Sequence, residues 1–209
     1  GMDRIVATSP NYASTSPVLA RRGDRLAVIP IGIPDVAAPG EEAVARWRDR
    51  LGTDFFLFVG SLRYYKGIAY LVEAARLSGL PVVIAGRDEE GLLAGLALPP
   101  SVTVLGEVSE DDKAALLALS RAFVLPSHLR SEAFGVALLE AARAGRPMIS
   151  CEIGTGTSYV NQHGTTGLVV PARRPDVLAA AMAQLARDAG GAETMGAAAR
   201  ARYEAHFTA

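Results

Sequence analysis

The sequence contains a single cysteine, Cys151, and this scarcity excludes whole classes of protein. One cysteine cannot form an intrachain disulfide framework, and it is typical of a protein kept in a reducing compartment. Cys151 lies in an apolar stretch, so a buried structural residue is a simpler interpretation than a nucleophile. Histidine is scarce as well. His128, His163 and His206 have no cysteine or histidine at metal-ligand spacing, which argues against a zinc site.

Long apolar runs and excess charge are also missing. No run approaches the roughly 18–20 continuous apolar residues of a transmembrane helix, and the first residues do not form a signal-peptide pattern. We interpret Gly1-Met2 as a cloning scar. The formal net charge is −1, which argues against an electrostatic nucleic-acid binder.

What the chain does have is hydrophobic sequence in short, regularly spaced blocks. Half of its 209 residues are hydrophobic, enough to bury a core. The predicted strands cover residues 4–8, 26–31, 54–60, 81–86, 102–106, 122–125, 147–150 and 167–170. The predicted helices cover residues 41–51, 66–77, 92–98, 110–119, 135–145, 175–187 and 193–206. Continuously apolar strands that alternate with helices predict a doubly wound, Rossmann-like α/β fold with a parallel sheet. We see no repeat or linker, and we therefore treat residues 1–209 as one domain.

The strand ends indicate where a ligand would bind. Ligands of doubly wound sheets bind at the carboxyl ends of the strands. Three predicted strands end in glycine, at Gly60, Gly86 and Gly106, and a fourth stops at Pro126-Ser127. We expect these ends to share one edge of the sheet and to form the site.

The stretch 122–151 carries two carboxylates around a predicted helix start. Glu140 is the only charged residue in an apolar helical run, and a partly desolvated carboxylate needs partners. Sugar hydroxyls would serve, because each can donate a hydrogen bond. Glu132 lies just before the helix, and the turn Phe134–Gly135–Val136 offers free amides at a positive helix terminus, where phosphate binds. The alternative is a surface loop with incidental carboxylates.

A second cluster follows the first glycine-ended strand, in the segment FVGSLRYYKGI at residues 58–68. Arg63 and Lys66 precede a helix there, and two cations beside a helix N-terminus suit a diphosphate. The segment does not match the Walker A pattern. An exposed basic turn is the alternative interpretation.

The glycine-rich run 152–171 is only superficially similar to a dinucleotide fingerprint. Gly154 and Gly156 fit, but Tyr159 takes the third glycine position, and we expect no strand-to-helix context. These features argue against a nicotinamide-binding fold. Polar residues of the run either contact a sugar or phosphate or make turns; they are Thr155, Thr157, Ser158 and Asn161.

Together these segments resemble the donor-binding, C-terminal half of a GT-B retaining glycosyltransferase of family 4, also called group 1, and the resemblance covers nearly the whole chain. The strongest match is Glu132-x7-Glu140 with Phe134-Gly135 between the carboxylates. Four further segments match in order: PIG at 30–32, VGSLRYYKG at 59–67, VLGEVS at 104–109 and TGLVVP at 166–171. Two positions depart from the family: Ser61 replaces the usual phosphate-loop arginine, and Ile31 replaces an asparagine.

The resemblance implies a role for each matched residue. Lys66 would neutralise the donor diphosphate, with Arg63 standing in for the missing arginine. Glu132 would act at the transferred sugar as the catalytic residue, and Glu140 would bind the ribose hydroxyls. The other implied donor contacts are Gly60, Ser61, Phe134, Gly135 and Val136, with Gly106, Glu107 and Val108 in the loop beside the nucleobase.

The implied activity is hexosyl transfer with retained configuration, for polysaccharide biosynthesis, without a metal or a cofactor. The donor would be a GDP- or UDP-linked sugar. Residues 152–161 resemble a mannosyltransferase-like branch, which favours GDP-mannose. The family's N-terminal acceptor domain is absent from this sequence, so we expect the chain alone to bind donor and to transfer little. We expect a cytoplasmic protein, with any contact to the inner membrane face made through the missing half.

Other functions stay open at this point. The chain could belong to a UDP-sugar-using transferase or to a sugar-nucleotide epimerase of the same fold. A non-catalytic α/β interaction module is a third reading, although Lys66, Glu132 and Glu140 are all present. A phosphorylase would need a pyridoxal-phosphate lysine, which we cannot place. The acceptor, the linkage and the oligomeric state do not follow from the sequence.

Overall fold

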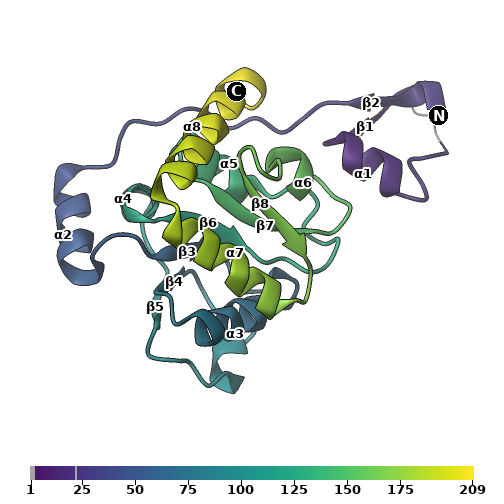
Figure 1. Ribbon diagram of the computed structural model, residues 1–209. Helices are drawn as coiled ribbons and strands as arrows, with labels where there is room; N and C mark the ends of the chain where they lie inside the picture. Colours follow the sequence, from purple (N-terminus) through teal and green to yellow (C-terminus); the bar gives the residue numbers. More distant parts are fainter. Residues whose placement is uncertain (1–2, 22) are drawn as a thin grey trace.

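The computed structural model describes residues 3–21 and 23–209. Gly1 and Met2, interpreted above as a cloning scar, lie outside the described residues. Within the described ranges, a parallel sheet forms the centre of the molecule and helices cover both of its faces (Figure 1). The predicted doubly wound α/β fold is confirmed.

The central sheet has six strands. They are β3 (Phe56–Val59), β4 (Val82–Ala85), β5 (Val102–Gly106), β6 (Ala122–Leu125), β7 (Met148–Glu152) and β8 (Gly167–Pro171). Their order is β5-β4-β3-β6-β7-β8, and every neighbouring pair is parallel. The chain builds the sheet from β3 to one edge, then returns and builds from β6 to the other. This reversal between β3 and β6 marks the usual ligand position in such sheets.

The helices form a layer on each face. On one face α3 (Ile68–Ser78) packs against α7 (Pro175–Arg187). The other face carries α4 (Glu110–Leu119) and α5 (Val136–Arg143), with α2 (Glu41–Leu51) packed on α4 and α8 (Ala189–His206) packed on α5 (Figure 1). No helix in the described part of the chain is both long and apolar enough to cross a membrane.

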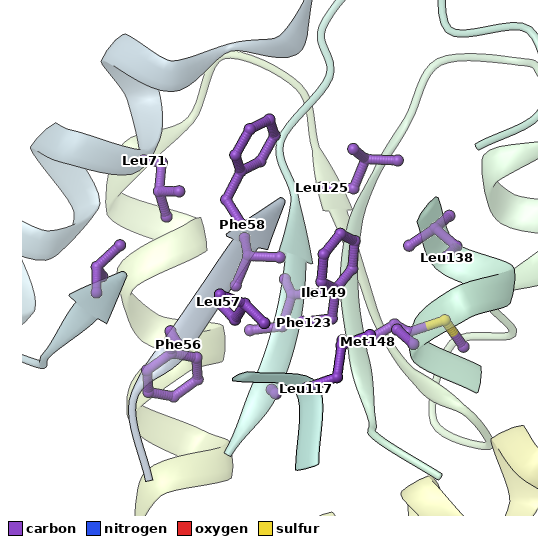
Figure 2. Packing of buried hydrophobic residues seen from close by; sticks show 14 of the residues in the cluster. Phe56, Leu57, Phe58, Leu71, Leu117, Phe123, Leu125, Leu138, Met148 and Ile149 are labelled. Carbon is purple, nitrogen blue, oxygen red and sulfur yellow. The ribbon is translucent and has the colours of Figure 1, made fainter. Parts of the chain in front are cut away.

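The core lies where the two helix layers meet the sheet. Phe56, Leu57 and Phe58 of β3 are at most 1% exposed, because a central strand is covered on both faces. Figure 2 shows these side chains packed with others from β6, β7 and the flanking helices, among them Leu71 and Leu138. Each fully buried side chain of this size contributes about 1.5–3 kcal/mol. The continuous apolar character of the strands thus follows from their position.

An N-terminal unit stands beside the main sheet. It consists of β1 (Ile5–Ala7), the short helix α1 (Pro10–Thr15) and β2 (Leu26–Val28). β1 and β2 pair in parallel with each other and do not join the six-stranded sheet (Figure 1). The stretches 4–8 and 26–31, which we predicted as strands of the parallel sheet, therefore form a separate pair, and β3 is the first strand of the central sheet.

Most predicted bounds agree with the structure, and the disagreements have local causes. The bounds of α2, α4, α7, β5 and β6 are those predicted. The helix predicted for 66–77 begins only at Ile68, because Tyr64–Lys66 forms a 3₁₀ turn and Gly67 has a positive φ of 75°. The helix predicted for 92–98 is reduced to a 3₁₀ turn, Leu92–Gly95. Its sequence ends in Pro99-Pro100, which cannot continue a helix.

Candidate active site

The candidate site lies at the carboxyl ends of β3 and β6, where the strand order reverses. Two loops leave the sheet there: residues 60–67 after β3 and residues 126–135 after β6. Although 66 positions separate Lys66 from Glu132 along the chain, strand pairing brings the two loops side by side. This is the edge of the sheet at which we expected a ligand to bind.

The two loops touch at the backbone. A Cβ atom added to Gly67 would lie 2.2 Å from the carbonyl oxygen of Pro126, so a larger residue could not enter without moving one loop. The backbone N–H of His128 donates to the Tyr65 carbonyl at 2.9 Å. The His128 ring lies edge-on between the rings of Tyr64 and Tyr70, with centroids 5.0 and 5.2 Å away. These contacts hold the turn at residues 64–67 against the loop that carries Glu132.

Lys66 and Glu132 meet across this junction. The Lys66 ammonium donates to Oε2 of Glu132 at 2.5 Å, and the Ser127 hydroxyl donates to the same oxygen at 3.1 Å. The lysine and glutamate side chains are only 14% and 10% exposed. Removing one partner of a desolvated ion pair leaves the other charge without compensation. The pair therefore keeps a cation and a carboxylate fixed at the strand reversal.

The N-terminus of α5 points its amides into the same region. Gly135 precedes the helix with a φ of 88°, and Val136 and Ala137 line the cavity described below. The first N–H groups of a helix have no intrahelical partner and carry a partial positive charge. Phe134 is 3% exposed and fixes the turn from behind, where a Cβ on Gly156 would lie 2.6 Å from its ring. Phe134 thus supports the turn, and its ring is not a cavity wall.

A cavity of about 520 Å³ opens between these groups and the edge of the sheet. Its walls come from the ends of β3, β4 and β5 and from the starts of α4 and α5. The lining residues used below are Gly60, Ser61, Lys66, Gly86, Arg87, Glu107, Val108, Glu110, Lys113, Val136, Ala137 and Glu140. Gly60 and Gly86 form part of the floor with backbone alone, since a Cβ on Gly86 would lie 2.0 Å from the Gly60 carbonyl oxygen.

Lys113 is a cavity residue that the sequence interpretation missed. Its ammonium donates to Oε1 of Glu140 at 2.7 Å and to Oε2 of Glu110 at 2.8 Å. Burial works to lower the pKa of Lys113, but the two carboxylates outweigh it and raise that pKa above its ordinary value. Glu140 therefore has a protein partner, in addition to any ligand hydroxyl that the sequence led us to expect.

The position of Lys113 is fixed by the start of α4. Ser109 caps the helix by accepting from the Asp112 amide at 3.1 Å. Asp112 in turn accepts from the Trp47 indole at 2.7 Å, which ties α2 to α4. The hydrogen bond from Ser109, followed by that from Trp47, lowers the pKa of Asp112. One anchored helical turn thus places the Lys113 side chain in the cavity wall.

The predicted site residues fall into three groups. Gly60, Ser61, Lys66, Val136, Glu140, Glu107 and Val108 line the cavity. Glu132 is 8% exposed and reaches the site through Lys66, while Phe134, Gly135 and Gly106 lie in the backbone turns around it. Arg63 forms the third group by itself: it pairs with Glu89 and Glu90, is 42% exposed and is absent from the cavity wall. Arg87, which pairs with Glu107 at 2.7 Å, is the cation that lines the cavity instead.

The glycine-rich run after β7 has a structural role. A short helix, α6 (Thr157–Val160), follows Gly156, so the expectation that no strand-to-helix context follows was wrong. Thr157 donates to the Cys151 carbonyl at 3.1 Å, and the Asn161 amide donates to the Ser150 hydroxyl at 2.9 Å. Thr155, Thr157 and Asn161 are buried, and these contacts make turns, as the second of our two interpretations proposed.

The structure also shows the surroundings of Cys151 and His128. Cys151 is 4% exposed, and burial raises the pKa of its thiol to about 12, so it is a structural residue, as expected. Among residues 3–21 and 23–209, no three histidine, cysteine, aspartate or glutamate side chains are grouped as a metal site would need. His128 is buried, with neither ring nitrogen hydrogen-bonded within that part of the chain.

Chemically, the cavity can hold an anion at one end and hydroxyl groups at the other. Lys66 and the α5 amides are positive groups at the strand reversal. Glu140 and Lys113 form a polar pair that can accept from and donate to hydroxyls. Glu132 lies beside Lys66, where it can act on whatever group extends from the anion.

The chain is similar in sequence to known proteins. Residues 41–202 match the family model described as glycosyl transferases group 1. The chain is 50% identical over 215 residues to the D-rhamnosyltransferase WbpZ of Pseudomonas aeruginosa. It is 45% identical over 217 residues to the O-antigen chain mannosyltransferase C of Escherichia coli. Both alignments cover 100% of this chain but 56% and 57% of the relatives. The chain thus spans about half the length of the curated relatives it matches.

Solved structures share the fold. The structure of Anabaena Alr3699/HepE in complex with UDP-glucose superposes with a TM-score of 0.84, at 19% identity, over 99% of this chain and 60% of that one. The sucrose-phosphate synthase of Thermosynechococcus elongatus superposes with a TM-score of 0.86, at 26% identity, over 100% of this chain and 55% of that one. The first likeness concerns the fold alone.

Proposed function

The chain belongs to the group 1 glycosyl transferases, and from this membership we propose that it binds the nucleotide-activated hexose of a retaining GT-B enzyme. The sugar would pass to a glycan or lipid-linked acceptor. One observation carries the proposal: a cavity at the strand reversal brings together Lys66, the α5 amides, Glu132 and Glu140. These groups match, in order, a diphosphate, a transferred sugar and a ribose.

The diphosphate would lie between Lys66 and the start of α5. Both are positive, and both are fixed before the ligand arrives, so they can stabilise the charge that develops as the diphosphate departs. A nucleoside diphosphate leaving group would then need no metal ion. Because the Lys66 ammonium donates to Glu132, an incoming phosphate would take over the lysine and free that carboxylate.

Glu132 would then face the anomeric carbon of the transferred sugar. A carboxylate there can stabilise the positive charge of an oxocarbenium-like transition state. Glu140 lies on the far side of Lys113, where it would accept from the ribose hydroxyls. The base would lie against Glu107 and Val108, at the end of β5.

We propose GDP-mannose as the donor. Support comes from the two relatives aligned over the whole chain, one named a D-rhamnosyltransferase and the other a mannosyltransferase. D-Rhamnose is 6-deoxymannose, so both names refer to sugars with the manno configuration. Transfer itself would need an acceptor-binding part, consistent with relatives that are nearly twice as long as the matched region.

The first test is calorimetric titration of the chain with GDP, UDP and ADP, in EDTA and then in magnesium. We expect GDP to bind most tightly, and to bind equally with and without the metal. Binding that appears only with magnesium would contradict the cation-and-amide account. Tighter binding of UDP would keep the transferase but remove GDP-mannose, and binding of none of the three would contradict the proposed function.

A further inference from the structure

Lysine is almost absent from this chain. The sequence holds 21 lysines and arginines, and Lys66 and Lys113 are its only lysines. Both line the same cavity, and each pairs with one of the two carboxylates: Lys66 with Glu132, and Lys113 with Glu140. Lysine and arginine are not interchangeable, because an ammonium is a compact point charge and a guanidinium is a planar fork. A lysine at both cavity positions of an arginine-rich chain indicates that this difference matters there.

Lys113 is held in a defined position. Its side chain is 12% exposed, and it bridges α4 to α5 through Glu140 at 2.7 Å while Glu110 takes a second bond at 2.8 Å. Glu110 is 87% exposed and follows the cap residue Ser109, whereas Glu140 is 22% exposed and faces the cavity. Both carboxylates line the cavity, but the bond to Glu140 is the more enclosed of the two, and Glu110 lies at the exposed rim.

The hydrogen-bonding capacity of the pair is only partly used. An ammonium has three N–H donors, and within the described residues Lys113 gives two of them to carboxylates. Oε1 of Glu140 accepts from Lys113, and no side chain of the described ranges donates to its Oε2. The pair thus offers a ligand one donor and one acceptor, side by side.

A cis-diol has the matching pattern. One hydroxyl can donate to Oε2 of Glu140 while its neighbour accepts from the Lys113 ammonium. We propose that Lys113 and Glu140 together bind the 2′,3′-diol of the donor ribose, and that Lys113 makes the site select ribonucleotides over deoxyribonucleotides. The inference rests on the proposed function, which places the ribose at Glu140.

An arginine at position 113 would not bind the diol together with Glu140 in the same way. A guanidinium tends to engage both oxygens of a carboxylate in a bidentate pair. It would occupy the free oxygen of Glu140 and leave the diol without its acceptor. The replacement Lys113→Arg, ordinarily conservative, is therefore the most informative change.

The experiment measures the affinity of GDP and of 2′,3′-dideoxy-GDP by calorimetry in EDTA. For the unchanged chain we expect GDP to bind roughly tenfold to a hundredfold more tightly, since charge-assisted hydrogen bonds are lost with the hydroxyls. In Lys113→Arg and in Lys113→Met the ratio should fall to about threefold or less. Both variants should lose affinity for GDP and change little for the dideoxy analogue.

Two controls separate this role from general damage. Arg76→Met removes a cation on α3 that pairs with Glu73 away from the cavity, and its ratio should equal that of the unchanged chain. The double variant Lys113→Met/Glu140→Gln removes both charges, so that neither group is left unpaired. If the two residues act as a unit, Lys113→Met will have no further effect on the ratio in the Glu140→Gln background.

The outcomes are distinct. If the unchanged chain binds GDP and its dideoxy analogue equally, the inference is wrong and the proposed function survives. The same holds if folded Lys113→Arg keeps the full ratio, or if the effects of Lys113→Met and Glu140→Gln are additive. If the unchanged chain binds neither nucleotide, the proposed function fails and the inference falls with it.

Discussion

The two ends of the cavity are built from the same pair of residue types in different settings. At the phosphate end, Lys66 and Glu132 join two loops at the strand reversal, and each is at most 14% exposed. At the ribose end, Lys113 and Glu140 join two helices, and Lys113 has a second, exposed partner in Glu110. Among the described residues, the lysine of the loop pair therefore has a single carboxylate partner, while the lysine of the helix pair has two.

The difference teaches how each end can accept a ligand. In the proposed complex the phosphate is an anion, so it would compete with Glu132 for Lys66, and binding would exchange one partner for another. The ribose is neutral, so its hydroxyls would add to the second pair without separating it. Diphosphate affinity should therefore depend on how strongly the protein holds its own carboxylate, and ribose affinity on how well its pair is oriented.

The largest effect should come from breaking the phosphate end with Lys66→Ala. We expect GDP to bind roughly tenfold to a hundredfold more weakly, because a charge-assisted contact to phosphate is lost, whereas guanosine should change little. Calorimetry or competition binding with both ligands measures this. Arg63→Ala is the matched control and should lose much less, since Arg63 is exposed and paired with Glu89 and Glu90. An equal loss for guanosine would place Lys66 away from the phosphates.

A crossed pair of substitutions sharpens the comparison. Glu140→Gln keeps the shape but removes the charge at the ribose end, so affinity for GDP and for GDP-mannose should both fall, by about tenfold. Glu132→Gln should bind GDP at least as well as the unchanged chain, because Lys66 loses its internal competitor. It should lose affinity for GDP-mannose and, in the full-length enzyme, most turnover.

The measurement is one affinity for each of two ligands against each of the two variants. Equal losses of GDP in both variants would contradict the division between the two carboxylates. So would a Glu132→Gln variant that loses as much affinity for GDP as for GDP-mannose.

The smallest effect is a loss of stability at low pH. It should come from His128, which lies behind the Lys66–Glu132 pair. Burial lowers the pKa of His128 from its ordinary value of 6.5, and the Arg173 cation adds to the lowering. Above that value the ring is neutral in both states, and stability is unaffected. As the pH falls below it, through the folded-state pKa, the unfolded chain takes up the proton first, and the free energy of unfolding falls.

Chemical denaturation at several pH values between about 7.5 and 5 tests this. His128→Gln should show a shallower decline in the free energy of unfolding than the unchanged chain, whatever its stability at neutral pH. Identical slopes would show that His128 does not carry the acid sensitivity.

The sequence predicted the fold well because local signals were sufficient for it. Continuous apolar strands gave the parallel sheet, and Ser109 and Pro175 lie where α4 and α7 begin. The short helices α1 and α6 were missed from the sequence, because they have only six and four residues and therefore show no hydrophobic periodicity. The site residues recognised by motif, such as Lys66 and Glu140, do line the cavity.

The missed residues needed contacts that only the fold supplies. Arg63 lies in the segment where we expected a cation, but it pairs with Glu89 and Glu90 at the surface. Arg87, which follows the next strand, lines the cavity. In the sequence Lys113 follows three acidic residues at the start of a helix, a pattern that does not indicate a binding residue. One signal in the sequence could have found it, namely that its only companion lysine lies in the phosphate loop.

The glycine floor of the cavity has a consequence for how this protein can change over generations. Where Gly86 crosses Gly60, the floor is backbone, and any side chain on Gly86 would collide with the carbonyl group of Gly60. Mutation therefore has no room to diversify the floor. It can act on the rim, where Arg87, Glu107 and Glu110 are exposed and α4 supplies the wall. New nucleotide preferences should arise in that rim, while the geometry that would receive the proposed diphosphate should pass unaltered from one descendant to the next.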